Sequence, residues 1–379
     1  MIFTNREIYL DNSATTKVSR TVADTVYDMM VNEYGNPSSL HSKGLEAQHR
    51  VEKARSILAE SIGADSREIY FTSGGTEGNN LAVIGTALRR RKTGNRIVTT
   101  STEHSSVMEA CGYLEKQGFE VVYLPVDRYG AVSEESIYEA VNEKTVLVSV
   151  MYVNNELGTI QPVERIKRII KRKNSQAVFH TDAVQAFGKL PVRAGKLNAD
   201  IITVSGHKIH APKGVGAIYI KKGTLITPRQ FGGEQQSRIR PGTEAAALIA
   251  GLGQAVSEIE ADTISAINEL NACLRKRLSE IDGTVINSPE NALGYVINFS
   301  VTGKKSETMV HFLAERGIYV SSGSACAKGK QSYVLKAAGL DKGLSDTAIR
   351  VSFSKYNTTQ DIDALAEAII CAKGIIADI

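Results

Sequence analysis

Short apolar runs alternate with amphipathic segments along the first two thirds of the chain. The amphipathic segments carry apolar residues at helical spacing, whereas the apolar runs are short and bounded by turn residues. Strands that alternate with helices are typical of an α/β fold, in which helices cover both faces of a mostly parallel sheet. The predicted strands lie near 68–72, 96–100, 120–124, 145–152, 177–181, 200–204 and 215–220, and the predicted helices near 45–62, 105–117, 133–142 and 163–172.

The pattern changes after about residue 245. One long helix is predicted at about 256–281, and the shorter elements beyond it suggest a smaller α+β domain. A chain of 379 residues is long enough for two domains. We therefore expect a large domain over 15–255 and a small domain made of 1–14 and 256–379. The later strands are predicted near 295–300, 318–321 and 348–353, and the later helices near 306–316, 331–338 and 360–372.

A glycine-containing turn, Ser73-Gly-Gly-Thr76, lies between a predicted strand and a helix that runs to Leu88. Gly75 lets the backbone approach a ligand, the helix N-terminus offers N–H donors, and Thr76 adds a hydroxyl, so the turn suits an anion. An ordinary strand–helix turn has the same composition, and both interpretations stay open at this point.

Three reactive side chains follow predicted strands, where an α/β sheet binds its ligands. Asp182 ends a buried strand and needs a partner, which could be a protonated pyridine nitrogen, a helix N-terminus or a cation. Lys208 follows the strand at 200–204, where a lowered pKa makes a lysine a nucleophile toward carbonyls. His104 follows another strand, although a lone histidine is more often structural. A phosphate grip, a pyridinium partner and a Schiff-base lysine together are what pyridoxal phosphate requires.

Composition and charge exclude several other classes of protein. The net charge is +4, and the basic run 89–92 ends a predicted helix, where cations suit the helix dipole, so we expect no direct nucleic-acid partner. No apolar run reaches membrane-spanning length and no signal-peptide pattern is present, which favours a cytoplasmic location without membrane contact.

The four cysteines form neither a CxxC pair nor a zinc-like pattern with histidine, so we expect no disulfide framework and no metal site. Cys111, Cys273 and Cys371 lie in predicted helices beside apolar residues and are predicted to be in the core. Cys326 differs, because its Ser/Gly-rich surroundings, 321–330, have no periodicity and predict a flexible loop.

The ordered set of motifs resembles the class V branch of fold-type I pyridoxal-phosphate enzymes, and within it the cysteine desulfurases of NifS/IscS type. The similarity covers nearly the whole chain. Its motifs are Asp11-Asn-Ser-Ala-Thr-Thr16, Tyr34-Gly-Asn-Pro-Ser-Ser-Leu-His41, Thr72-Ser-Gly-Gly-Thr-Glu-Gly-Asn-Asn80, Thr102-Glu-His104, Val153-Asn-Asn-Glu-Leu-Gly158, His180-Thr-Asp-Ala-Val-Gln185, Ser205-Gly-His-Lys208, Arg240-Pro-Gly-Thr243, Ser321-Ser-Gly-Ser-Ala-Cys326 and Ile349-Arg350.

The resemblance implies pyridoxal 5'-phosphate as cofactor and a role for each site residue. Lys208 would bind the cofactor covalently and move the Cα proton, while Asp182 would keep the pyridine nitrogen protonated. Gln185 would contact the phenolate oxygen, and His104 would stack on the ring and assist proton transfers. The implied cofactor-binding set is Gly75, Thr76, His104, Asn155, Asp182, Gln185, Ser205, His207 and Lys208, with Thr243 reaching in from the second subunit of a homodimer.

The resemblance also implies the reaction. Asn155 and Arg350 would hold the carboxylate of L-cysteine, Arg350 as a bidentate fork. Cys326, as a thiolate, would accept the sulfur as a persulfide and pass it to an acceptor protein, such as an iron–sulfur cluster scaffold or a thiolation enzyme. The cysteine loop is slightly shorter than in relatives, with Ala327-Lys-Gly-Lys330 in place of a Thr/Ser-rich run.

Two alternatives stay open from sequence. One is another class V reaction, that of a selenocysteine lyase or an aminotransferase. The other is a protein that keeps the fold as a platform for sulfur relay without catalysis, although the joint presence of Lys208, Asp182, His104 and Cys326 argues against it.

Overall fold

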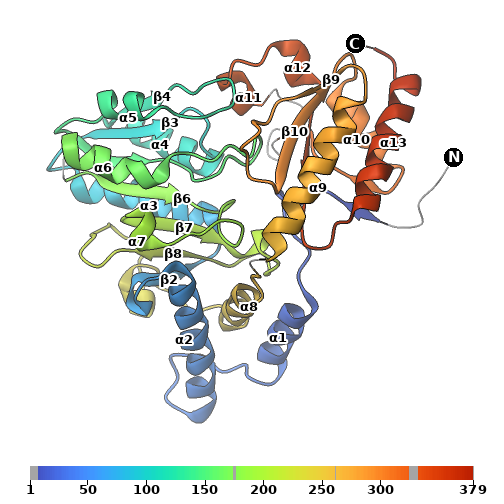
Figure 1. Ribbon diagram of the computed structural model, residues 1–379. Helices are drawn as coiled ribbons and strands as arrows, with labels where there is room; N and C mark the ends of the chain where they lie inside the picture. Colours follow the sequence, from blue (N-terminus) through green and yellow to red (C-terminus); the bar gives the residue numbers. More distant parts are fainter. Residues whose placement is uncertain (1–6, 174–175, 261, 324–331, 379) are drawn as a thin grey trace.

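The computed structural model describes residues 7–173, 176–260, 262–323 and 332–378 (Figure 1). A seven-stranded sheet has the order β2-β8-β7-β6-β5-β3-β4. Only β8 runs antiparallel to its two neighbours, so the predicted mostly parallel sheet is confirmed. The strands are β2 (Ile69–Thr72), β3 (Arg96–Thr100), β4 (Glu120–Leu124), β5 (Thr145–Ser149), β6 (Val178–Asp182), β7 (Ile201–Ser205) and β8 (Gly216–Ile220).

Both faces of this sheet are buried. Successive side chains of a strand point to opposite faces, so neighbouring residues of one strand pack into different hydrophobic clusters. Val178 and Ile201 belong to the hydrophobic cluster under α3 and α4, whereas their neighbours Phe179 and Ile202 belong to the cluster on the opposite face. This explains why the strands read as continuous apolar runs. The covering helices are α3 (Gly75–Arg90), α4 (Ser105–Lys116), α5 (Glu134–Ala140), α6 (Val163–Lys173) and the short α7 (Ala194–Leu197).

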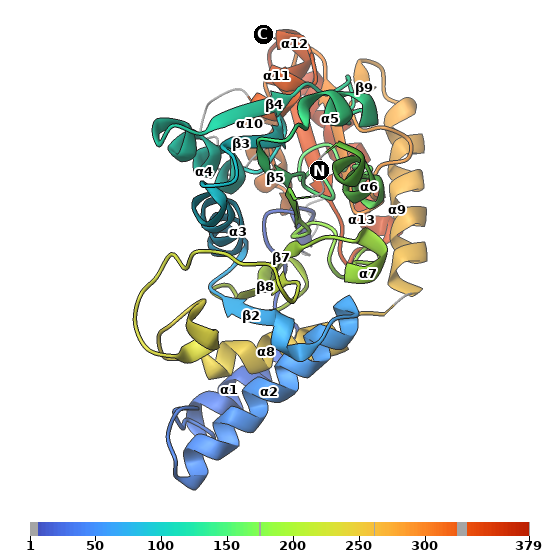
Figure 2. The same cartoon turned by 90° about the vertical axis from the view of Figure 1, so that its left-hand side faces the viewer.

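Three helices form an arm that extends from the sheet, as Figures 1 and 2 show: α1 (Arg20–Val31), α2 (Ser42–Ile62) and α8 (Ala246–Ser257). The prediction of one helix over 256–281 is wrong. Its first residues end α8, and a separate helix, α9, spans Asp262–Ser279. The chain divides here because α8 packs against α1 and α2, whereas α9 packs against the last helix.

The second unit is built on an antiparallel sheet of order β12-β10-β9. The first described strand, β1 (Ile8–Tyr9), pairs in parallel with β11 (Ile318–Tyr319), so the N-terminal segment joins this unit. The remaining elements are β9 (Thr284–Ile286), β10 (Val296–Val301), β12 (Ala348–Ser352), α10 (Ser306–Ala314), α11 (Tyr333–Ala337), α12 (Lys342–Asp346) and α13 (Thr359–Ile375), with 3-10 turns η1 (Ser66–Glu68), η2 (Gly206–Lys208) and η3 (Gln235–Arg238).

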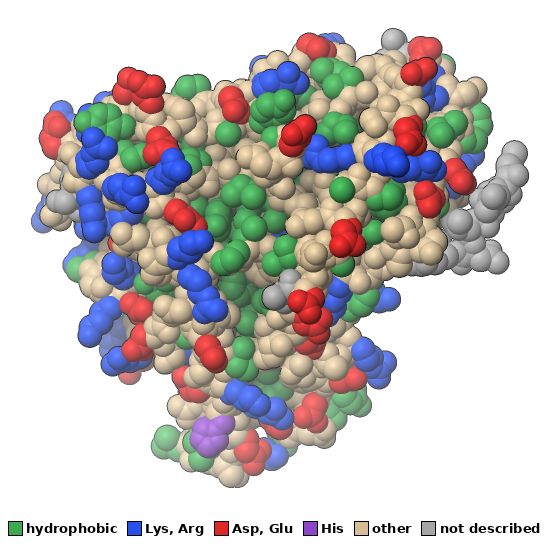
Figure 3. All heavy atoms as spheres, viewed as in Figure 1, with side chains coloured by type: hydrophobic (Ala, Val, Ile, Leu, Met, Phe, Trp, Pro, Cys, Tyr) green, Lys and Arg blue, Asp and Glu red, His purple; other side chains and the backbone are tan. Residues whose placement is uncertain are grey.

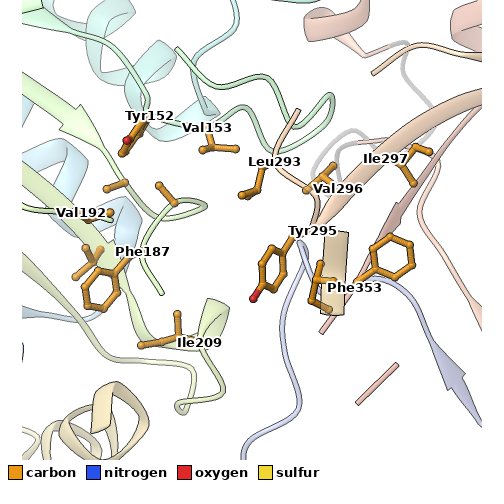
Figure 4. Packing of buried hydrophobic residues seen from close by; sticks show 14 of the residues in the cluster. Tyr152, Val153, Phe187, Val192, Ile209, Leu293, Tyr295, Val296, Ile297 and Phe353 are labelled. Atoms are coloured by element: carbon orange, nitrogen blue, oxygen red, sulfur yellow. The ribbon is translucent and has the colours of Figure 1, made fainter. Parts of the chain in front are cut away.

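The hydrophobic core is continuous between the two sheets. Figure 4 shows Phe187 and Ile209 on one side of this contact and Tyr295 and Phe353 on the other, and all four belong to one buried cluster. On the face drawn in Figure 3, hydrophobic side chains gather in the middle and charged side chains of both signs surround them.

The cysteines do not all follow the prediction. Cys111 is buried, Cys273 is partly buried, and Cys371 is exposed, so its predicted core position is wrong. Cys371 lies on the exposed side of α13, whose buried side packs against α9 and α10. Among the described helices, none is long and apolar enough to cross a membrane. The described residues also contain no cluster of three or more His, Cys, Asp or Glu side chains that could hold a metal ion.

Candidate active site

A cavity of about 270 Å³ lies at the carboxyl ends of the central parallel strands. It gathers every residue predicted for the site except Thr243 and Cys326. Thr243 is exposed away from this cavity, and Cys326 lies outside the described residues. The cavity is lined by Ser13, Ala14, Gly75, Thr76, Asn79, His104, Met151, Asn155, Asp182, Val184, Gln185, Ser205, His207, Lys208 and Arg350.

Lys208 is presented to the cavity by the 3-10 turn η2, directly after β7. Its Nζ donates to the carbonyl oxygens of Ser13 at 2.5 Å and Ala14 at 2.8 Å. The N-terminal segment therefore holds the amine in place. The neighbouring His207 is neutral at pH 7, because burial and the charge of Lys208 lower its pKa to about 4.

Asp182 is the last residue of β6 and is buried. Its Oδ2 accepts a hydrogen bond from Asn79 Nδ2 at 2.6 Å, and its Oδ1 accepts one from the backbone N–H of Val184 at 2.9 Å. These donors offset part of the cost of burying a carboxylate. The acid also lies in the cavity wall, where it can face a bound cationic ring nitrogen.

The predicted anion site is the N-terminus of α3. Gly74 has φ of +151°, which only glycine adopts readily, and a Cβ on Gly75 would meet Val184 Cγ2 at 2.7 Å. The N-cap residue is Gly74, which has no side chain that could accept hydrogen bonds from the first-turn N–H groups. The Ser205 hydroxyl is buried nearby and has no hydrogen-bond partner among the described residues. Free backbone donors and an unsatisfied hydroxyl fit a phosphate group.

Gln185 is held from both ends of its amide. Its Nε2 donates to Ser13 O at 3.0 Å, and its Oε1 accepts from Lys189 Nζ at 3.2 Å. Lys189 was not predicted from the sequence. It is buried, and burial together with the charges of Lys208 and Arg350 lowers its pKa to about 7.

Arg350, in β12, brings the second sheet to the cavity and is 2 % exposed. Its Nη1 donates to Asn155 O at 3.0 Å. The Arg350 Nε and the Asn155 side-chain oxygen are buried and lack partners within the described chain. The unused N–H of the guanidinium, in the cavity wall, matches a carboxylate ligand.

The ends of the segment that carries Cys326 lie beside Glu156, the residue after Asn155. Ser332 Oγ donates to Glu156 Oε2 at 2.5 Å, and a Cβ on Gly323 would lie 3.3 Å from the same oxygen. Tyr333 Oη donates to the backbone oxygen of Glu103. The chain therefore enters and leaves residues 324–331 next to the rim of the cavity.

Sequence reasoning missed Asn79, Lys189 and the N-terminal residues Ser13 and Ala14. Asn79 lies three residues after Thr76 on the same helix, and this spacing places both on one face, which was an available signal. No sequence signal connects Ser13 with Lys208, because 195 residues separate them.

Comparison with known proteins agrees with this geometry. Residues 8–365 match the family described as Aminotransferase class-V. A cysteine desulfurase IscS of Methanosarcina thermophila is 42% identical over 372 residues, which cover 96% of this chain and 91% of that protein. A cysteine desulfurase IscS of Dictyoglomus turgidum is 41% identical over 94% of this chain and 92% of its own length.

Solved structures agree as well. A NifS-like protein superimposes with a TM-score of 0.93 at 38% identity, covering 98% of this chain and all (100%) of its own. The structure of SspA in complex with cysteine superimposes with a TM-score of 0.83 at 34% identity, covering 93% of this chain and 100% of its own. The resemblance to NifS/IscS-type proteins is thus confirmed, and the chain belongs to the class-V aminotransferase family.

Proposed function

We propose that this chain is a cysteine desulfurase that uses pyridoxal phosphate to convert L-cysteine to L-alanine and receives the sulfur on Cys326 as a persulfide. The observation that carries the proposal is the convergence of Lys208, Asp182 and Arg350, from distant parts of the chain, on one cavity. The names of the relatives support cysteine as the substrate, since one structural neighbour is a complex with cysteine.

The residues present fit the cofactor. The N-terminus of α3 and the unpartnered Ser205 hydroxyl suit its phosphate, Asp182 suits a protonated ring nitrogen, and Lys208 suits its aldehyde. Thr76, His207 and Gly75 also line the cavity and would complete the phosphate site, and His104, Asn155 and Gln185 would lie against the ring. When bound, pyridoxal phosphate supplies an electron sink that stabilises negative charge at the substrate Cα.

The chain's own groups would carry the remaining work. Arg350 and Asn155 would bind the substrate carboxylate and orient the Cα–H bond toward Lys208. Lys208 would take the Cα proton at Nζ and return a proton later. His104 would assist proton transfer at the substrate. The Cys326 thiolate would attack the substrate sulfur, so that the C–S bond breaks, an S–S bond forms, and protons on Cα and Cβ complete L-alanine.

The quaternary and cellular parts of the proposal rest on the family. We propose a homodimer in which Thr243 of each subunit completes the phosphate site of the other, in keeping with its exposed position in the single chain. We also propose that Cys326 delivers sulfur to an acceptor protein in the cytoplasm. The division into domains 15–255 and 1–14 with 256–379 remains part of this proposal.

The test measures alanine and sulfide from the cofactor-loaded protein with L-cysteine and a thiol reductant. Wild type should release the two products in equal amounts, and Cys326→Ala should release neither. Cys371→Ala is the matched control, because this exposed thiol lies on α13, and it should behave as wild type. Mass spectrometry of the Cys326 peptide without reductant should show the addition of one sulfur atom.

Other outcomes identify the alternatives. Turnover that survives Cys326→Ala points to an aminotransferase, which needs no sulfur acceptor. A strong preference for selenocysteine over cysteine points to a lyase. A protein that binds no cofactor and turns over neither substrate is a sulfur-relay platform.

A further inference from the structure

A chain of hydrogen bonds joins Asp182 to His104 through two residues that sequence reasoning gave no role. Asn79 Nδ2 donates to Asp182 Oδ2 at 2.6 Å and to Ser106 Oγ at 2.9 Å. Ser106 Oγ lies 2.8 Å from His104 Nδ1, and the Ser106 backbone N–H donates to the same nitrogen at 3.2 Å. Asn79 is 1% exposed and Ser106 is 6% exposed, so water does not compete readily for these groups.

The Asp182 carboxylate decides which atom donates and which accepts in each of these hydrogen bonds. A carboxylate only accepts hydrogen bonds, so the Asn79 amide must turn its nitrogen toward Asp182. The same nitrogen then donates its second hydrogen to Ser106 Oγ. Because Ser106 Oγ accepts from Asn79, its single hydrogen is available for His104 Nδ1.

His104 Nδ1 therefore faces two donors, a hydroxyl and a backbone N–H, and must present its lone pair to them. In a neutral imidazole the hydrogen then resides on the other nitrogen, Nε2. Burial lowers the pKa of His104, against the opposing effect of the Asp182 charge, so the neutral ring is favoured. Since His104 lines the cavity, its ring can offer an N–H to bound substrate.

We propose that Asn79 and Ser106 are positioning residues that fix His104 as the neutral tautomer with its hydrogen on Nε2. The inference deepens the proposed function, on which it rests for the role of His104 in proton transfer. It makes Asp182 serve the site twice, once toward the cofactor ring and once, through Asn79 and Ser106, toward the orientation of the histidine.

The direct test reads the tautomer of His104 by long-range proton–nitrogen NMR correlation in the cofactor-loaded protein labelled with 15N-histidine. The His104 signals are identified by their absence in His104→Gln. Near neutral pH, wild type should show a protonated Nε2 and an unprotonated Nδ1. A protonated Nδ1 in wild type would overturn the inference, whether or not any variant folds.

The variants separate positioning from general stability. Ser106→Ala removes the hydroxyl donor, and Asn79→Leu removes the contact that directs it, so only the longer bond from the Ser106 backbone N–H then holds the Nδ1 lone pair. Both variants should therefore raise the share of the Nδ1-protonated tautomer above that of wild type. Ser106→Thr keeps the hydroxyl and should restore the wild-type signals. Asn80→Ala is the matched control, because within the described residues the Asn80 side chain bonds only to the backbone oxygens of Thr76 at 3.0 Å and Ser106 at 3.2 Å. An unchanged tautomer in both Ser106→Ala and Asn79→Leu would contradict the proposal.

Kinetics give an independent readout. Ser106→Ala should lower kcat for cysteine by about 10-fold while the KM stays within about twofold, because a misoriented acid–base group affects the chemical step and Arg350 is untouched. A wild-type protein that shows the expected tautomer but no desulfuration would refute the proposed function and leave the positioning inference standing.

Discussion

Arg350 Nη2 donates to Asp11 Oδ1 at 2.7 Å, and this ion pair joins two residues that lie 339 positions apart. Asp11 belongs to the N-terminal segment that also supplies the oxygens bound by Lys208. The guanidinium is almost fully buried, and a buried arginine needs a partner to offset its desolvation. Asp11 therefore holds one edge of Arg350, while the Nε remains available to a ligand.

Arg350→Lys should raise the KM for cysteine by about 10- to 100-fold, with a smaller effect on kcat. A lysine retains the charge but lacks the planar fork of five N–H donors that spans Asn155 O, Asp11 and a carboxylate, so about 1.5–3 kcal/mol of charged hydrogen bonding is lost. Steady-state kinetics measure the split. Asp11→Asn keeps the guanidinium and should raise the KM only severalfold, and an unchanged KM in Arg350→Lys would exclude Arg350 from substrate binding.

Glu103→Gln should make stability less dependent on pH. Glu103 is fully buried, its Oε1 accepts from Thr100 Oγ1 at 2.8 Å and from Met151 N at 2.9 Å, and burial raises its pKa to about 8. Since the folded pKa exceeds the unfolded one, the stability that the neutral acid contributes is complete below about pH 4.5 and is lost as pH rises through about 8. A neutral glutamine preserves the acceptor and removes this loss.

Urea unfolding at about pH 5 and about pH 9 measures the effect of Glu103→Gln. The variant should gain stability relative to wild type at the higher pH. Glu143→Gln, on the surface, is the control and should show no such difference. A constant difference between Glu103→Gln and wild type at both pH values would mean that Glu103 does not titrate in this range.

Lys189→Met should change how stability depends on pH between about 7 and 10.5. The pKa of Lys189 is lowered to about 7, so the folded state binds fewer protons than the unfolded state between about 7 and 10.5. The wild-type stability therefore rises with pH across this window, and burial of the amine costs most below it. Methionine avoids that cost, so the variant should be favoured more at about pH 6 than at about pH 10.

The same urea unfolding series tests Lys189→Met, with the exposed Lys221→Met as control. The variant also loses the hydrogen bond to Gln185, which should lower its stability equally at every pH and leave the slope of stability against pH unchanged. A variant whose stability relative to wild type does not depend on pH would show that Lys189 keeps an ordinary pKa.

Gly75→Ala should lower the free energy of unfolding by about 1–3 kcal/mol, because the new methyl group overlaps Val184 Cγ2. Val184→Ala removes the atom in the way. The double variant should therefore lose less stability than the sum of the losses in the two single variants, by roughly 0.5–3 kcal/mol. Gly195→Ala, where a Cβ would meet nothing within 4 Å, is the matched glycine control. Simple additivity would show that α3 shifts instead.

Much of the fold was predictable because the central strands are buried on both faces, so their apolar runs stand out and the polar residues at their ends mark one edge of the sheet. Asp182, Lys208 and His104 were found in this way. The prediction failed where the local sequence pattern does not show which neighbours a helix packs against. The segment 256–281 was predicted as one helix, yet it holds the end of α8 and a separate helix, α9, because α8 and α9 pack on different neighbours. Cys371 likewise has apolar neighbours in sequence but lies on the open side of α13.

The sequence by itself determined the residue types, the order of strands and helices, and the family to which the motifs point, because these are encoded in local composition and spacing. Only the tertiary structure decided which partners these residues meet. Arg350 with Asp11, Lys208 with Ser13, and Asn79 with both Asp182 and Ser106 are contacts between distant segments, and no local periodicity specifies them. They arise because the N-terminal segment, the helix α3 and the second sheet all pack at the carboxyl edge of the central sheet, where each buried polar group must find a hydrogen-bond partner.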